Sequence, residues 1–163
     1  ATGQDFKAFA DTYLFSKLDI NARWWRDPSG NYLSYCCLDM TQAEFGRFGS
    51  MILNNGDDII SEAFINDILA TDSFYNLQFW FGLNTLETRG YDGQIIAIDF
   101  SNELIVLRNS LYFPKTEGDF IFRNDGDSYA ADIDAPLTLP SVVMQIEDNF
   151  DMNQFLDILK SNN

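Results

Sequence analysis

Two apolar runs on either side of a short polar turn constrain the fold of this chain most strongly. The first run, Gln94–Asp99, contains four apolar residues in succession, and so does the second, Glu103–Asn109. Ser101-Asn102 supplies a short turn, so the two runs are predicted to pair as an antiparallel β-hairpin in the interior of a sheet. Continuous apolar runs indicate burial on both faces, as when helices cover each side of a sheet.

Helical periodicity dominates the residues that precede this hairpin. Residues 5–18 have the spacing of an amphipathic helix. A second helix is predicted after Thr41, which forms a Thr-x-x-Glu capping box with Glu44, and Gly56 suits its C-terminal cap. Ser61 is predicted to cap a third helix. The side chains expected to face inward from these helices are Phe6, Phe9, Tyr13, Leu14, Phe45, Phe48, Ile52, Phe64, Ile65, Ile68 and Leu69.

The remaining segments complete an α+β pattern. Leu77–Leu83 is an aromatic-rich strand candidate, and residues 114–141 are rich in Gly, Asp and Pro, as loops are. Asp151 and Gln154 form a last capping-box pattern before an apolar face of Phe155, Leu156 and Leu159. We therefore expect a single domain over residues 1–163, with a helical region at 1–75 and sheet strands plus a C-terminal helix at 76–163.

Charge and composition exclude several function classes. The formal net charge is −15, which disfavours nucleic acid and anionic membranes as partners. Histidine is absent, which removes a Ser-His-Asp triad and His-based zinc sites from this chain. The adjacent Cys36 and Cys37 indicate no disulfide framework, and no apolar run is long enough for a membrane span. No metal site and no cofactor site is predicted.

Three segments carry a resemblance to a known family. Leu14–Ile20 is similar to a helix end of the form Leu-Phe-x-x-Leu-Gly-Ile, with Asp19 in place of the Gly. Thr41–Gly49 resembles Thr-x-x-Asp-x-x-Arg-Phe-Gly, and Leu53–Gly56 resembles the Leu-x-Asn-Gly that follows it. Tyr35-Cys36-Cys37 departs from the pattern, because the family usually has glycines there. The third segment consists of Phe81–Leu83, then Arg89–Gln94, then the hairpin, and it resembles the strand with a Lys-Thr-Gly or His-Thr-Gly motif. In this order and spacing, the segments resemble the serine β-lactamase-like (penicillin-recognising) hydrolases.

The resemblance implies the C-terminal portion of a β-lactamase/transpeptidase-like fold, with antiparallel strands covered by helices. It places Tyr91 at the Lys/His position of the third motif, Asp92 at the Thr position and Gly93 at the Gly position. The backbone N–H of Gln94 would then be one of two oxyanion donors, and residues 91–94 would form the substrate-binding strand. The weighed alternative is that these residues are only the entry to a strand.

The catalytic residues that the family requires are not in this chain. Its nucleophile is the Ser of Ser-x-x-Lys, which the Lys one helical turn away deprotonates. The residues three before the four lysines are Gln4, Leu14, Tyr112 and Asp157, and none of them is serine. The resemblance implies part of a serine hydrolase that acts on an ester, amide or β-lactam through an acyl-enzyme, and the missing motif implies that this chain is inactive by itself. The alternative is a non-catalytic binding or assembly module of the same fold.

Expectations about partners and location follow from the resemblance. The start of the chain, Ala1-Thr2-Gly3-Gln4-Asp5, resembles the interior of a longer reading frame. Because the family's N-terminal strands are absent, the sheet would expose an edge and apolar faces, so the chain is expected to associate with its missing N-terminal half or with another copy. A periplasmic or secreted location is slightly favoured by the family. Two weaker site candidates are Trp24-Trp25 as a pocket lining, with packing favoured, and a calcium loop, with a solvated acidic loop favoured. The calcium candidates are Asp125, Asp127, Asp132 and Asp134.

Overall fold

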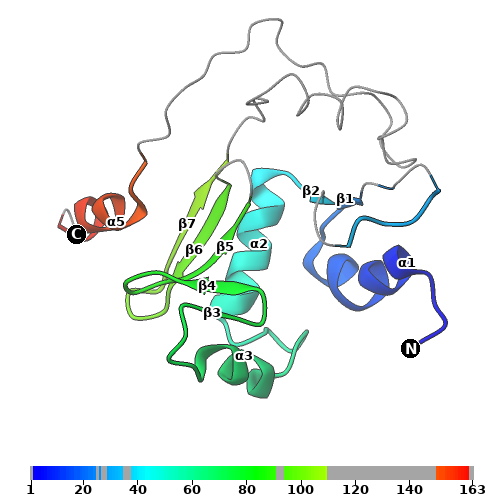
Figure 1. The fold of residues 1–163 in the computed structure, drawn as a ribbon, viewed down its shortest axis with the longest axis horizontal. Coiled ribbons are helices and arrows are strands. Elements are labelled where there is room, and N and C mark those ends of the chain that lie inside the picture. The colour runs from blue at the N-terminus through cyan, green and yellow to red at the C-terminus, as the bar shows by residue number, and fades with distance from the viewer. Residues whose placement is uncertain are drawn as a thin grey trace, which may run out of the picture. The chain divides into compact units, whose positions relative to one another are not determined.

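The computed structural model describes residues 2–24, 26, 29–34, 38–90, 94–109 and 150–161. These residues form an α+β structure that divides into two compact units (Figure 1). The first unit comprises the described residues up to Phe48, and the second comprises those from Gly49 to 109 together with 150–161. The boundary falls inside the helix α2, Gln42–Leu53.

The first unit begins with a continuous helical run. It consists of α1 (Phe6–Ala10), a π-helical turn η1 (Asp11–Phe15) and a 3₁₀ turn η2 (Ser16–Leu18). The predicted helix over 5–18 is thus confirmed, but its inward face is corrected. Because the wider π turn and the tighter 3₁₀ turn shift the helical phase, the buried side chains are those of Phe15 and Leu18. The side chains expected inward are more than a third exposed at Phe6, Phe9 and Tyr13.

A two-stranded sheet completes the first unit. β1 (Arg23–Trp24) pairs antiparallel with β2 (Leu38–Asp39). An isolated antiparallel bridge between Arg26 and Tyr32 brackets a turn in which Gly30 has a φ of +83°. Glycine adopts a positive φ at no steric cost, which suits it to such a turn.

The second unit is built on a five-stranded antiparallel sheet in the order β3-β4-β5-β6-β7 (Figure 1). Its strands are β3 (Tyr75–Asn76), β4 (Phe79–Phe81), β5 (Leu86–Arg89), β6 (Ile95–Asp99) and β7 (Leu104–Arg108). The predicted hairpin is confirmed, with Ala97 opposite Val106.

Three predictions about the sheet are corrected. The hairpin loop has four residues, Phe100–Glu103, because Asp99 pairs directly with Leu104. Among the described strands β7 lies at the end of the sheet, so only β6 of the hairpin is interior. The strand expected at 77–83 shortens to β4, because Leu77 and Gln78 form a turn with positive φ.

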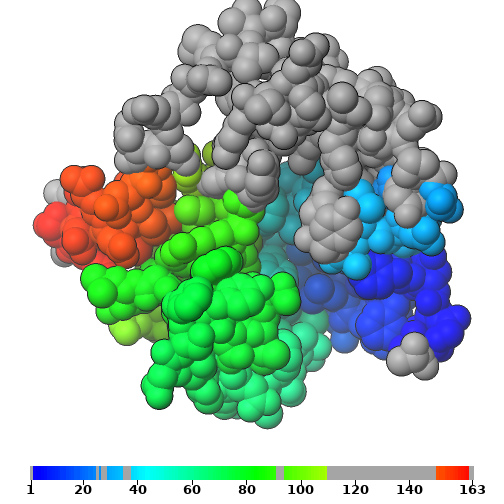
Figure 2. Space-filling view, in the orientation of Figure 1, coloured from blue at the N-terminus to red at the C-terminus, as the bar shows by residue number. Residues whose placement is uncertain are grey.

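Helices cover both faces of the β6–β7 hairpin, as its apolar runs predict. On one face Gly49 of α2 lies against Ile96 and Ile105. On the other face α5 (Met152–Ser161) buries Met152 and Leu156 against Ala97 and Val106. In Figure 2 the atoms of α5, in orange, lie directly against the yellow-green strands.

Side chains cap the helices at the predicted residues. Thr41 N–H donates to Glu44 Oε2 at 2.6 Å, and Glu44 N–H donates to Thr41 Oγ1 at 3.3 Å. Ser61 Oγ accepts from Phe64 N–H at 3.2 Å at the start of α3 (Glu62–Leu69). Asp151 Oδ1 accepts from two N–H groups of α5. Gly56, with a φ of +95°, donates its N–H to Met51 O at 2.8 Å and ends α2.

The inward faces of α3 and α5 are narrower than the sequence predicts. Ile65 and Ile68 are fully buried, whereas Phe64 is 44% exposed. In α5 the buried stripe begins with Met152 rather than Phe155, since only residues three or four apart share a face. Phe155 instead contacts Phe150, with the two rings tilted and their centroids 5.8 Å apart.

Within the described part of the chain, none of the helices has the length and apolar character that a bilayer crossing requires.

The close packing of α2 on the sheet depends on a glycine at position 49, where any side chain would meet the strands. A Cβ there would lie 3.1 Å from Ile105 Cγ2 and 3.2 Å from Ile96 Cγ2. Gly49→Leu should therefore lower the free energy of unfolding by about 2 kcal/mol through overpacking. The control is Ser50→Leu, one exposed position further along α2, which should change it by less than about 0.5 kcal/mol. Urea unfolding measures both, and equal effects would show that α2 does not pack as closely as described.

Candidate functional site

The predicted substrate-binding strand is only partly within the described structure. Tyr91, Asp92 and Gly93 lie outside the described residues. Gln94 is half-buried and immediately precedes β6. Its carbonyl accepts a hydrogen bond from Gly90 N–H at 2.8 Å.

Strand pairing fixes the backbone at Gln94. Arg89 of β5 is opposite Ile95 of β6, one residue further in from the Gly90–Gln94 hydrogen bond. A Cβ at Gly90 would lie 2.4 Å from Gln94 Oε1, so the Gln94 side chain lies directly over Gly90. The predicted role of the Gln94 N–H as an oxyanion donor stays a prediction.

Residues of the first two resembling segments contact each other in the first unit. Asp19 has a φ of +52°, a left-handed conformation that glycine adopts at no steric cost. The Asp19 carbonyl accepts a hydrogen bond from Arg47 Nη2. Glu44 Oε1 accepts from Asn21 N–H at 2.6 Å. The end of the helical run is thus fastened to the first turns of α2 by two side chains of the Thr41–Gly49 segment.

The second and third resembling segments contact each other in the second unit. Gly49 ends the Thr41–Gly49 segment and lies against Ile96 and Ile105 of the hairpin. At the end of α2, Gly56 is equally constrained, because a Cβ there would lie 2.2 Å from Ile60 O. Gly49 and Gly56 therefore have structural roles: Gly49 allows α2 to pack closely on the hairpin, and Gly56 allows the close backbone approach at the end of α2.

Hydrogen bonding keeps Glu44 ionised. The N–H of Asn21, then that of Thr41, lowers the pKa of Glu44 below its ordinary value, and these bonds outweigh the opposing effect of burial. The Thr41 hydroxyl, which donates to Oε2 at 2.7 Å, and the charge of Arg47 act in the same direction. A carboxylate whose oxygens are engaged in this way holds structure together.

A buried polar network on β5 was not predicted from the sequence. Glu87 is 2% exposed and accepts from Thr85 Oγ1 at 2.6 Å and from Arg89 Nε at 2.7 Å. Gly82, which follows β4, leaves room for these two side chains, because a Cβ there would lie 2.4 Å from both Glu87 Oε1 and Thr85 Oγ1. The signal that could have revealed it is the polar Thr-x-Glu-x-Arg alternation, which puts three side chains on one strand face.

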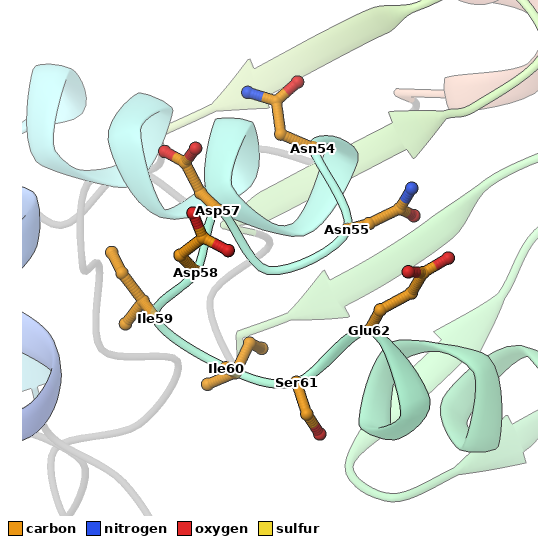
Figure 3. A pocket seen from close by; sticks show the side chains of 8 residues that line it. All are labelled: Asn54, Asn55, Asp57, Asp58, Ile59, Ile60, Ser61 and Glu62. Carbon is orange, nitrogen blue, oxygen red and sulfur yellow. The ribbon is translucent and has the colours of Figure 1, made fainter.

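An open polar hollow of about 560 Å³ lies between α2 and α3 (Figure 3). Its lining includes the carboxylates of Asp57, Asp58 and Glu62, of which Glu62 starts α3. Among the described residues no group of three or more His, Cys, Asp or Glu side chains is arranged to hold a metal ion. The four calcium candidates and the Cys36-Cys37 pair lie outside the described residues.

Trp24 is a packing residue. Its ring lies 4.5 Å from that of Phe6 and 6.3 Å from those of Phe15 and Tyr32, centroid to centroid. The indole N–H donates to Leu33 O at 2.9 Å, which satisfies its polar edge. Trp25 lies outside the described residues.

A scan against protein-family models, a search of curated proteins and a search of solved structures all find no match to this chain.

Proposed function

We propose that this chain is the C-terminal part of a β-lactamase/transpeptidase-like domain and forms one wall of its acyl-transfer site. One observation carries the proposal: Asp19, where the resembling pattern has Gly, has a left-handed φ of +52°. A position that needs this conformation explains why a family would place Gly there. The proposal is also supported by the contacts that join the three resembling segments, between Arg47 and Asp19 and between Gly49 and the hairpin.

In the proposed reaction the chain stabilises the negative charge that develops on the substrate and forms one wall of the substrate-binding site. The nucleophilic Ser and its Lys come from a segment outside this sequence. As the acyl-enzyme forms, the carbonyl oxygen of an ester, amide or β-lactam gains negative charge, and the Gln94 N–H donates to it. Gly93 allows close approach of the acyl group, and Tyr91 donates a hydrogen bond to the substrate or to a catalytic proton network.

The chain by itself is expected to form no covalent adduct with a penicillin or a fluorophosphonate probe. The reason is the absence of Ser-x-x-Lys from its sequence. Intact mass spectrometry of the pure chain measures this, with the intact protein that contains it as the control. We expect one adduct per intact protein, on a Ser of Ser-x-x-Lys.

The same labelling distinguishes the proposed enzyme from a non-catalytic relative. An intact protein without Ser-x-x-Lys that takes no probe would overturn the hydrolase proposal and favour a binding or assembly module. An adduct on the isolated chain would show that its own residues suffice, which would contradict the proposed division of the site.

A further inference from the structure

An ion pair and a narrow apolar stripe join the C-terminal helix α5 to the sheet. Lys160 Nζ lies 2.6 Å from Asp99 Oδ2 at the end of β6. The Asp99 side chain is completely buried, whereas the Lys160 side chain is 28% exposed. The apolar stripe consists of Met152, Leu156 and Leu159, on the same sheet face as Ala97 and Val106.

Asp99 also organises the β6–β7 turn. Its Oδ1 accepts from the N–H groups of Ser101 and Asn102, both at 3.1 Å. Its Oδ2 accepts from Asn102 Nδ2 at 2.9 Å in addition to Lys160. A single buried carboxylate thus binds a hairpin turn and a helix at once. Without Lys160 it would stay buried with its charge uncompensated, because the other donors are neutral.

Packing against the sheet stabilises the helical conformation of α5. The helix has ten residues, and helices shorter than about 12 residues are marginal in water by themselves. Only Met152 and Leu156 within it are buried, while Phe155 and Ile158 are 38% and 53% exposed.

The sheet has support that does not involve α5. β6 is hydrogen-bonded to β5 on one side and to β7 on the other. On the opposite face Gly49 of α2 lies against Ile96 and Ile105, and the neighbouring Met51 and Ile52 of α2 are buried. Loss of α5 therefore removes cover from one sheet face and leaves the strand pairing and the other layer intact.

We propose that α5 is a releasable strap, held on the sheet by the Asp99–Lys160 ion pair. Without the pair, α5 leaves the sheet and loses its helical structure, and the face formed by Ala97 and Val106 becomes exposed. The sheet stays folded, so release is a local opening of the second unit. The strap is a conformational device, and it is independent of the proposed acyl transfer.

Amide hydrogen exchange of the full chain under native conditions tests the strap. Lys160→Met keeps the length of the side chain and removes its charge. We expect protection of the α5 amides to fall about 100-fold, and that of the β6 amides to fall less than about threefold. The matched control is Lys7→Met, which removes a 2.7 Å pair with Asp11 on the surface of the first unit. It should leave α5 and β6 unchanged.

A second variant tests whether charge is the cause. Adding Asp99→Asn to Lys160→Met replaces the lone buried carboxylate by a neutral amide, and should restore about tenfold of the lost α5 protection. Unchanged α5 protection in Lys160→Met would overturn the proposal. So would an equal loss in α5 and β6, or a failure of Lys160→Met to fold, because α5 would then be an inseparable part of the unit. Equal protection of the α5 amides in the single and double variants would show that the uncompensated charge of Asp99 does not cause the loss of α5 protection.

Discussion

Glu44→Ala should lower the free energy of unfolding by about 3 kcal/mol, since bonds to a charged acceptor are among the strongest in proteins. The carboxylate accepts from Asn21 N–H at 2.6 Å, from Thr41 N–H at 2.6 Å and from the Thr41 hydroxyl at 2.7 Å. Alanine would leave these part-buried donors without that acceptor. Urea unfolding of the full chain at pH 7 measures the loss.

A matched control separates this network from a general preference for acids at helix starts. Glu62 occupies the first turn of α3 and is exposed. Its interaction with the helix dipole alone is worth about 0.5 kcal/mol, which is the loss expected for Glu62→Ala. Similar losses for the two variants would mean that the hydrogen bonds to Glu44 from Asn21 and Thr41 add nothing to stability beyond the interaction with the helix dipole.

The pH dependence has a definite sign. The folded-state pKa of Glu44 is lowered, chiefly by the N–H of Asn21, below the unfolded value of about 4.3. Its stabilising contribution is therefore complete above that pH and is lost as the pH falls through the folded-state pKa. The difference between the native chain and Glu44→Ala should stay constant from about pH 7 to 5 and shrink below about pH 4. A difference that grew with acid would contradict the assignment.

The titration of Asp99 does not affect the stability difference between the native chain and Glu44→Ala. Burial raises the pKa of Asp99, but the hydrogen bonds from Lys160 and Asn102 outweigh burial and lower it. Its acid response has the same sign as that of Glu44 and is present in both proteins. It cancels when the two stabilities are subtracted.

Local spacing predicted the elements whose stabilising contacts are themselves local. The Thr41–Glu44 capping box follows from a three-residue spacing, and the hairpin follows from two apolar runs. The hydrogen bond between Asn21 and Glu44, which are 23 residues apart, could not be inferred from the sequence. It depends on the tertiary fold that brings the end of the first helical run next to α2. β5 escaped prediction because Glu87 is a buried charge in a strand, which breaks the apolar-inside pattern.

The turn of the hairpin was misjudged for a related reason. Ser101-Asn102 has the composition of a two-residue turn, but the Asp99 side chain accepts both of their N–H groups and the loop has four residues. The helix at 5–18 was predicted, whereas its change from α to π to 3₁₀ geometry was not. Of the predicted site, only Gln94 is described, and the roles of Tyr91, Asp92 and Gly93 stay predictions.

In the proposed acyl-transfer enzyme, Gly93→Val should reduce turnover about 100-fold or more, the typical cost of losing one oxyanion donor. The resemblance places Gly93 on the strand that lines the cleft, where a branched side chain would occupy the space of the acyl group. It would also displace the Gln94 N–H from the developing negative charge. Stability should change less, because valine suits a strand.

The matched control changes the next side chain and keeps its backbone donor. Gln94→Ala should alter turnover only slightly, since the proposed donor is the N–H that alanine also has. It would remove the amide that lies over Gly90, so its melting temperature must be checked beside that of Gly93→Val. The decisive measurement is turnover of the two variants at matched folded fraction. A crippling Gln94→Ala with a nearly silent Gly93→Val would mean that the side chain of Gln94, rather than its backbone, faces the substrate, and the alignment of this strand to the third motif would be wrong.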